Sequence, residues 1–73
     1  MPKLYSARQI VKALKRIGFE VVSQKGSHIK LRKTLDGEIC TAIVPNHKEV
    51  ALGTLHSVLK QAGITRAQLE ENI

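Results

Sequence analysis

Two tight turns in the middle of the chain constrain its fold more than any other feature. They lie at residues 25–27 and 35–37 and separate three β-prone runs at residues 19–24, 28–33 and 39–44. Strands joined by such short turns pair as antiparallel neighbours, because a parallel pair needs a crossover of a dozen or more residues. The sequence therefore predicts an antiparallel three-stranded sheet, whose last strand ends at Pro45.

The second run alternates cleanly between apolar and polar positions. Ile29 and Leu31 fall on one side of the predicted strand, whereas His28, Lys30 and Arg32 fall on the other. Successive side chains of a strand point to opposite faces of a sheet. We therefore expect the two apolar residues to face the helices. The three polar residues should lie on the open face of the sheet or at its edge.

A helix is predicted before the sheet. Ser6 and Gln9 form a capping-box pattern, in which each side chain bonds the backbone of the other residue. Apolar residues then recur at i, i+3, i+4 and i+7 from Ile10 to Ile17, which gives one apolar stripe. Gly18 is well placed to end this helix in a left-handed conformation.

A second helix is predicted after a loop at residues 45–53. Thr54 is the expected N-cap, a second apolar stripe covers residues 55–62, and Gly63 is the expected end of the helix. Another capping-box pattern at residues 65–68 predicts a last short turn of helix.

The order of these elements defines the expected fold class. It is an α+β fold with the order α-β-β-β-α, in which the helices cover one face of the antiparallel sheet, and it resembles the double-stranded-RNA-binding domain. A chain of 73 residues has room for one core, so we expect residues 1–73 to form one domain. A catalytic domain and a separate binding domain do not both fit in a chain of this length.

Positive charge is concentrated in the first half of the chain. The twelve basic and six acidic residues give a net charge of +6, and nine of the bases lie with a single acid in residues 1–33. Such asymmetry is typical of nucleic-acid binding, although a solvated basic face gives the same pattern. An anion-binding surface should therefore be built from the first half of the chain.

The single cysteine, Cys40, excludes an internal disulfide framework and a cysteine-rich zinc site. A lone thiol in an apolar strand is typical of a small buried residue in a reducing cytosol. The longest run without a charged residue, residues 50–59, has ten residues, which is too short to cross a bilayer. We therefore expect a cytoplasmic protein with no membrane partner.

His28 is the residue best placed for chemistry. It opens the second strand directly after Gly26 and Ser27, close to Lys25 and to the two basic residues of its own face. Nearby cations favour a neutral imidazole, which can act as a general base. The glycine turn allows close approach of a phosphate to backbone N–H groups. This set fits attack of an RNA 2′-hydroxyl on its own phosphate; the alternative is a surface histidine beside a turn.

The other two histidines give weaker signals. His47 lies beside Lys48 in the loop before the second helix and is a candidate proton donor, phosphate ligand or capping residue. The helix start around Thr54 offers free N–H groups to an anion. His56 falls inside that helix, where we expect an exposed or rim residue. The histidine and cysteine spacings match no metal site, so we expect neither a metal nor another cofactor.

Six short motifs occur in an order that is specific at this length. They are Gly18-Phe19, Gly26-Ser27-His28, Asp36-Gly37, Val44-Pro45-Asn46-His47, Gly53-Thr54-Leu55 and Leu59-Lys60-Gln61-Ala62-Gly63-Ile64. This set resembles the HicA family of mRNA interferase toxins, the RNA-cleaving halves of HicA–HicB toxin–antitoxin pairs. In that family the histidine of the Gly-Ser-His turn is catalytic, and it falls on His28. The Pro-x-His element of the family falls on Pro45 and His47.

The resemblance implies an endoribonuclease toxin that cleaves mRNA and is blocked by a HicB-like antitoxin. We expect His28 to be catalytic, and we expect RNA contacts from Lys25, Gly26, Ser27, Lys30, Arg32, His47, Lys48 and Thr54. The basic face of the first helix, with Arg8, Lys12, Lys15 and Arg16, is expected to contact RNA phosphates as well. One alternative is a non-catalytic, double-stranded-RNA-binding-like module that uses the same face. Another is a single-strand binder that stacks bases on sheet aromatics. It is disfavoured because the only aromatics, Tyr5 and Phe19, fall outside the predicted open face.

Overall fold

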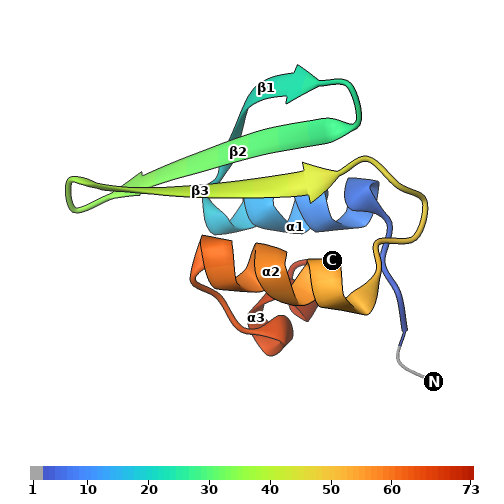
Figure 1. Ribbon diagram of the computed structural model, residues 1–73. Helices are drawn as coiled ribbons and strands as arrows, with labels where there is room; N and C mark the ends of the chain where they lie inside the picture. Colours follow the sequence, from blue (N-terminus) through green and yellow to red (C-terminus); the bar gives the residue numbers. More distant parts are fainter. Residues whose placement is uncertain (1–2) are drawn as a thin grey trace.

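The computed structural model describes residues 3–73. Its elements, in chain order, are α1 (Ala7–Ile17), β1 (Glu20–Lys25), β2 (His28–Leu35), β3 (Glu38–Pro45), α2 (Leu52–Ala62) and α3 (Arg66–Glu70). The strands form one antiparallel sheet in the order β1-β2-β3. The helices lie together on one face of this sheet (Figure 1). The predicted α+β fold and its antiparallel sheet are confirmed.

Helix α1 begins and ends where its sequence predicts. The Gln9 N–H donates to the Ser6 hydroxyl, and the Ser6 N–H donates to the Gln9 side chain, which completes the capping box. Gly18 ends the helix at a φ of 117°. Lys33 of β2 reaches this end, where its Nζ donates to the Ile17 carbonyl oxygen at 3.0 Å. A cation is favourable there because the last carbonyls of a helix lack backbone partners.

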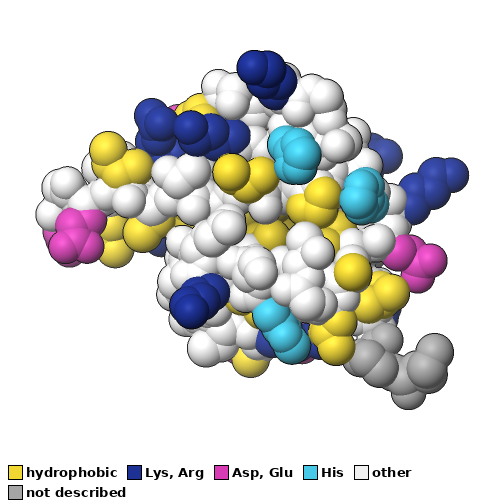
Figure 2. Space-filling model, in the orientation of Figure 1, with side chains coloured by type: hydrophobic (Ala, Val, Ile, Leu, Met, Phe, Trp, Pro, Cys, Tyr) yellow, Lys and Arg dark blue, Asp and Glu magenta, His cyan; other side chains and the backbone are white. Residues whose placement is uncertain are grey.

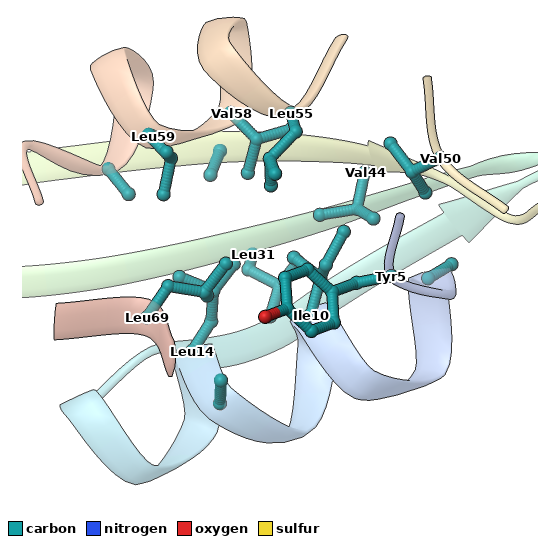
Figure 3. Close-up of a cluster of buried hydrophobic side chains, with 14 of the residues drawn as sticks. Tyr5, Ile10, Leu14, Leu31, Val44, Val50, Leu55, Val58, Leu59 and Leu69 are labelled. Carbon is teal, nitrogen blue, oxygen red and sulfur yellow. The ribbon is translucent and has the colours of Figure 1, made fainter. Parts of the chain in front are cut away.

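The core lies between the helix-covered face of the sheet and the three helices (Figure 3). Its fully buried large side chains come from both layers: Ile10, Leu14, Leu31, Val44, Val50, Leu55, Val58 and Leu69. Truncating one such leucine to alanine typically costs about 2–5 kcal/mol, a large part of the stability of a small domain. Tyr5 and Phe19 are buried as well, so neither aromatic lies on the open face of the sheet.

Strand β2 separates the two faces of the sheet as predicted. Ile29 and Leu31 are buried against the helices. His28, Lys30 and Arg32 alternate with them and lie on the opposite side, where Lys30 is partly buried and the other two are exposed. The open face therefore carries a strip of polar and basic side chains along the central strand.

Helix α2 begins earlier than its sequence predicts. Thr54 is not the N-cap: the helix starts at Leu52, and its N-cap is Ala51, which makes no side-chain capping bond. The earlier start results from a contact between distant segments of the chain. Val50 is buried, and its N–H donates to the Tyr5 carbonyl oxygen at 2.8 Å. This contact fixes the backbone immediately before the helix, so Thr54 lies within the first turn.

The remaining differences from the sequence predictions are small. Phe19 precedes β1 rather than starting it, and Pro45 is the last paired residue of β3. Gly63 ends α2 in a left-handed conformation and the capping box at residues 65–68 starts α3, as predicted. Cys40, which the sequence predicts to be buried, is only half-buried, whereas Ala42 and Val44 of the same strand are buried.

Candidate functional site

The end of the sheet at which β2 begins and β3 ends meets helix α2 in a hollow that has both apolar and polar walls. His28 and His47 line this hollow, together with Thr54, Ser57 and Gln61 of α2. Figure 2 shows two of the three histidines close together over this end of the sheet and the third apart from them, over α2. The fold thus brings together His28, His47 and Thr54, which the sequence nominated from three separate segments.

His28 is placed by the turn between β1 and β2. Gly26 occupies this turn with a φ of 59°, a conformation that glycine adopts without a steric penalty. His28 then opens β2, opposite Lys25 of β1 and Pro45 of β3. Its side chain is exposed. A solute can therefore reach the imidazole directly, and removal of the imidazole leaves no cavity in the core.

Backbone hydrogen bonds hold the loop that carries His47. The Asn46 N–H donates to the Ser27 carbonyl oxygen, which ties the loop to the β1–β2 turn. The His47 N–H donates to the Pro45 carbonyl oxygen at 2.8 Å, and the Ala7 N–H donates to the His47 carbonyl oxygen at 2.9 Å. The loop is thus held between that turn and the first turn of α1, which brings the second histidine to the first.

The segment before α1 helps to hold this loop, although its residue Tyr5 does not line the hollow. Besides its backbone bond from Val50, Tyr5 donates its hydroxyl proton to the Glu70 carboxylate. Arg66 also donates to that carboxylate, at 3.2 Å. These hydrogen bonds from Tyr5 and Arg66 lower the pKa of Glu70, and the bond to Glu70 raises the pKa of Tyr5. The ionised Glu70 therefore anchors the segment that holds the loop.

Helix α2 contributes a polar stripe of three residues to the hollow. The sequence analysis identified only the first of them, Thr54. Thr54, Ser57 and Gln61 recur at i, i+3 and i+7 and line the hollow. Gln61 Oε1 accepts from the Ile43 N–H at 2.9 Å, which ties the helix to the outer edge of β3. The Ser57 hydroxyl donates to the Gly53 carbonyl oxygen at 3.3 Å. The available signal was the helical period, because this stripe runs beside the apolar stripe of the same helix.

The basic residues nominated by the sequence lie at different distances from His28. Lys25 is directly opposite His28, and Lys30 is two residues farther along β2 on the same face. Arg32 is four residues from His28, or about 13 Å along the strand. It lines a different hollow, together with Gly18 and residues of β1 and β2. We call Lys25, Lys30 and Arg32 the basic strip.

Lys48 directly follows His47 in the loop after β3. It lines a neighbouring hollow with Asn46 and His47 and with Ser6 and Arg8 from the start of α1. The sequence analysis expected Arg8 to contact RNA as part of the basic face of the first helix, but it placed neither Ser6 nor Arg8 beside His47. No local spacing signals it, because the two segments are about 40 residues apart and meet only through the loop contacts described above.

The described part of the chain offers no evident site for a metal. Within residues 3–73, no three histidine, cysteine or acidic side chains are grouped so that they could hold a metal ion. His56 is exposed on α2 as expected, and it does not line the hollow of the other two histidines. Across the same residues, no helix has the length and apolar character needed to span a membrane.

The hollow has the components of proton transfer beside an anion. Two imidazoles, one from the first residue of β2 and one from the loop after β3, line one hollow, and an imidazole can accept a proton or donate one according to its charge. Backbone N–H groups of a glycine turn and neighbouring cations can stabilise negative charge next to them. This arrangement suits a reaction in which an anion gains charge while a proton moves.

Comparison with known proteins places the chain in a family. The model of a family described as the HicA toxin of bacterial toxin–antitoxin systems matches residues 7–64. This range runs from the first residue of α1 to just beyond α2 and includes both histidines of the hollow. Among curated proteins, none matches the chain significantly. Because the family match covers most of the sequence, the chain belongs to the HicA family of bacterial toxin–antitoxin toxins.

Proposed function

We propose that this toxin is an endoribonuclease that cleaves mRNA in the hollow lined by His28 and His47. The observation that supports the proposal best is the presence of both imidazoles on one surface, next to the basic strip. A protein that only binds RNA needs cations, but it has no need of two exposed imidazoles at the same place. Membership of a toxin family supports the same reading.

In the proposed reaction, the RNA supplies its own nucleophile. His28 takes the proton of a 2′-hydroxyl as that oxygen attacks the adjacent phosphorus. The bond between phosphorus and the 5′-oxygen of the next nucleotide breaks, and a protonated His47 gives its proton to the departing oxygen. The products are a 2′,3′-cyclic phosphate and a 5′-hydroxyl. Water is not consumed, and no step calls for a metal or another cofactor.

The other nominated residues hold the substrate. Those nearest to His28 are Lys25, Gly26, Ser27 and Lys30, which we assign to the reacting phosphate. Lys48 and Thr54 lie beside His47 and fit the leaving side of the bond. Arg32, about 13 Å along β2 from His28, fits a phosphate of a neighbouring nucleotide. Their cationic and hydroxyl groups are typical phosphate ligands.

The partner that regulates the toxin is proposed to be a HicB-like antitoxin. Family membership implies an antitoxin, and the basic strip next to an exposed His28 indicates where it binds. A protein that presents carboxylates to this strip attaches to the same surface as RNA and covers the imidazole. Charge complementarity of this kind mainly speeds encounter and sets the register of the complex.

The products of cleavage test the chemistry. We expect activity to persist in EDTA, the fragments to carry 2′,3′-cyclic phosphate and 5′-hydroxyl ends, and RNA with 2′-deoxy sugars to survive. Mass spectrometry of the fragments and a gel of the deoxy substrate measure these outcomes. Loss of activity in EDTA that magnesium restores would contradict the proposed mechanism.

The role of His47 is tested with an activated substrate. A uridine 3′-(4-nitrophenyl phosphate) has a leaving group that departs without a proton. His47→Ala should therefore slow cleavage of ordinary RNA far more than cleavage of this ester, whereas His28→Ala should slow both by a similar factor. If His47→Ala slows both substrates equally, His47 holds the phosphate rather than donating the proton.

A non-catalytic RNA-binding module is the alternative from another functional class. The nuclease and the binding module are distinguished by the length of the RNA after incubation with the purified protein. A binding module retards intact RNA on a native gel, and the RNA recovered on a denaturing gel has its original length. A nuclease shortens it, and His28→Ala abolishes the shortening while it leaves the retardation.

A further inference from the structure

A second groove lies on the helix-covered side of the sheet end, between helix α1 and strands β1 and β2. Its rim carries Arg8, Lys12 and Lys15, which recur on one side of α1. Its apolar lining comes from Val11, which is partly buried, and Ile29, which is buried, so these two side chains form its floor. The groove has a volume of about 460 Å³, within the range of small-molecule sites. None of the three basic residues belongs to the basic strip or to the histidine hollow.

Two side-chain amides complete the groove, those of Gln24 and Asn46. Gln24 is paired with Ile29 across the β1–β2 ladder, so both side chains lie on the side of the sheet that faces the groove. Asn46 directly precedes His47 in the loop after β3. Both residues are exposed, so a ligand can reach their amides.

These two amides differ from the others in the protein. The sequence contains six asparagine and glutamine residues, and four of them are bonded within the described structure: Gln9, Gln61, Gln68 and Asn72. Among the side-chain hydrogen bonds of residues 3–73, none involves the amide of Gln24 or Asn46. The two amides left free for a ligand thus lie in one groove.

The groove adjoins the histidine hollow around the end of the sheet. Asn46 and Arg8 line both this groove and the small hollow of Lys48. His47 lines both that small hollow and the hollow of His28. The three depressions therefore follow one another around the loop at residues 45–48. This succession gives a flexible strand at His28 a continuous path over the loop to the groove.

We propose that this groove binds the base of an unpaired nucleotide next to the scissile bond, and that Gln24 and Asn46 determine which base is accepted. The inference rests on the proposed RNA cleavage and names the form of RNA that the enzyme takes. The apolar floor receives the face of the base, the amides bond its edge, and Arg8 and Lys12 bind the flanking phosphates. Unpaired bases are recognised by contacts of this kind, to their faces and to their hydrogen-bonding edges.

A paired RNA segment does not fit this groove. In an A-form duplex the faces of the bases are stacked on one another and the major groove is too narrow for side chains to read. An apolar floor flanked by free amides then has no partner to contact. The substrate is therefore a single strand or a loop, although the fold resembles a domain named for duplex binding.

Base preference is the direct test. A library of RNAs with random sequence is cleaved by the wild type, Gln24→Ala, Asn46→Ala and Thr34→Ala, and the fragment ends are sequenced. We expect the wild type to prefer certain bases at one position beside the cut, and each amide variant to reduce that preference on the order of 10-fold. Asn46→Ala keeps the backbone N–H that bonds Ser27. Thr34→Ala, an exposed change outside the groove, should leave the preference intact.

A binding measurement tests the groove without cleavage. In a His28→Ala background, we expect an unpaired oligonucleotide to bind more tightly than the same sequence in a duplex. Lys12→Ala should weaken binding and reduce the slope of log affinity against log salt by about 0.7, the contribution of one phosphate contact on a single strand. Lys60→Ala removes the same charge from α2, outside the groove, and should change neither quantity.

The outcomes separate the two proposals. If the wild type cleaves RNA but both amide variants keep its base preference, the groove proposal is wrong and the nuclease stands. If the wild type cleaves no RNA, the nuclease proposal falls and the binding measurement decides on the groove. Tighter binding to the duplex, or equal salt slopes for Lys12→Ala and Lys60→Ala, overturns the groove proposal in either case.

Discussion

The two ends of the β2–β3 hairpin differ in how firmly they are held. At the near end, His28 pairs with Pro45, and the loop beyond is bonded to the β1–β2 turn and to α1. At the far end, the hairpin projects beyond the helices (Figure 1). There Leu35 and Ile39 are 58% and 62% exposed on either side of the Asp36-Gly37 turn.

The difference shows where this small domain can support chemistry. A proton-transfer site needs side chains held in a fixed relation to each other, and only the near end is connected to several elements. The far end has the backbone geometry of a stable hairpin, with positive φ at Asp36 and Gly37 as a type I′ turn requires. Regular geometry alone does not bring a second functional group to that end.

The largest expected effect is the loss of the proposed general base, His28, at the near end. His28→Ala should lower the rate of RNA cleavage by about 10²–10⁴, the usual contribution of general-base catalysis. Stability and RNA affinity should change little, because the imidazole is exposed. Single-turnover cleavage assays and thermal unfolding measure these quantities, and bacteria without antitoxin should grow when they express the variant. His56→Ala, outside the hollow, is the matched control; a wild-type rate for His28→Ala refutes the assignment.

The second effect concerns the antitoxin and the open face. Reversal of Lys30 and Arg32 to Glu should lower the association rate with the antitoxin on the order of 10-fold at low salt. It should also flatten the salt dependence, because the Debye length at 0.15 M is about 8 Å and only close charges contribute. Stopped-flow association measures both. The control is Arg16→Glu with Lys60→Glu, an equal charge change on the helices. Equal effects of the two double variants would place the antitoxin elsewhere.

A smaller effect compares the turn at Gly26 with the turn at Gly37. Gly26 and Gly37 both have positive φ, and a Cβ at either position meets open space. Alanine at either site should therefore lower the free energy of unfolding by about 1–2 kcal/mol through backbone strain alone. Only Gly26→Ala should also slow cleavage, because the turn before His28 is the one proposed to contact the reacting phosphate. Denaturant titration and cleavage rates below the unfolding range test this, and equal loss of activity in both variants would contradict it.

The smallest expected effect concerns the hydrogen bond between Tyr5 and Glu70, which anchors the segment before α1. The pKa of Glu70 is lowered in the folded state by the hydrogen bonds from Tyr5 and Arg66. A lowered carboxyl pKa stabilises the fold above the unfolded-state pKa, and this contribution is lost as pH falls through the folded-state pKa. The thermal midpoint of the wild type should therefore drop below about pH 4.5 more steeply than that of Glu70→Gln. Parallel curves would show that the contact does not contribute to stability.

Much of the fold follows from local patterns in the sequence. The capping boxes at Ser6 and at residues 65–68, the glycine helix ends and the alternation of β2 are confirmed, because each depends on residues a few positions apart. The prediction that α2 starts after an N-cap at Thr54 was wrong for the opposite reason. The start of this helix depends on Val50, whose side chain is buried in the core. The Val50 N–H donates to the carbonyl oxygen of Tyr5, which is 45 residues away in the sequence.

The sequence by itself determined the strand order and the two faces of β2, since periods of 2 and 3.6 residues and turn chemistry are local properties. It also pointed to His28, through the Gly26-Ser27-His28 turn and the resemblance to the HicA family. Only the tertiary structure decided that His47 joins His28 on one surface, that Arg32 lies apart from this pair, and that Gln24 and Asn46 share a groove with α1. The reason is physical. These relations depend on the Asn46–Ser27 and Ala7–His47 backbone bonds, which join segments far apart in the chain and leave no local pattern in the sequence.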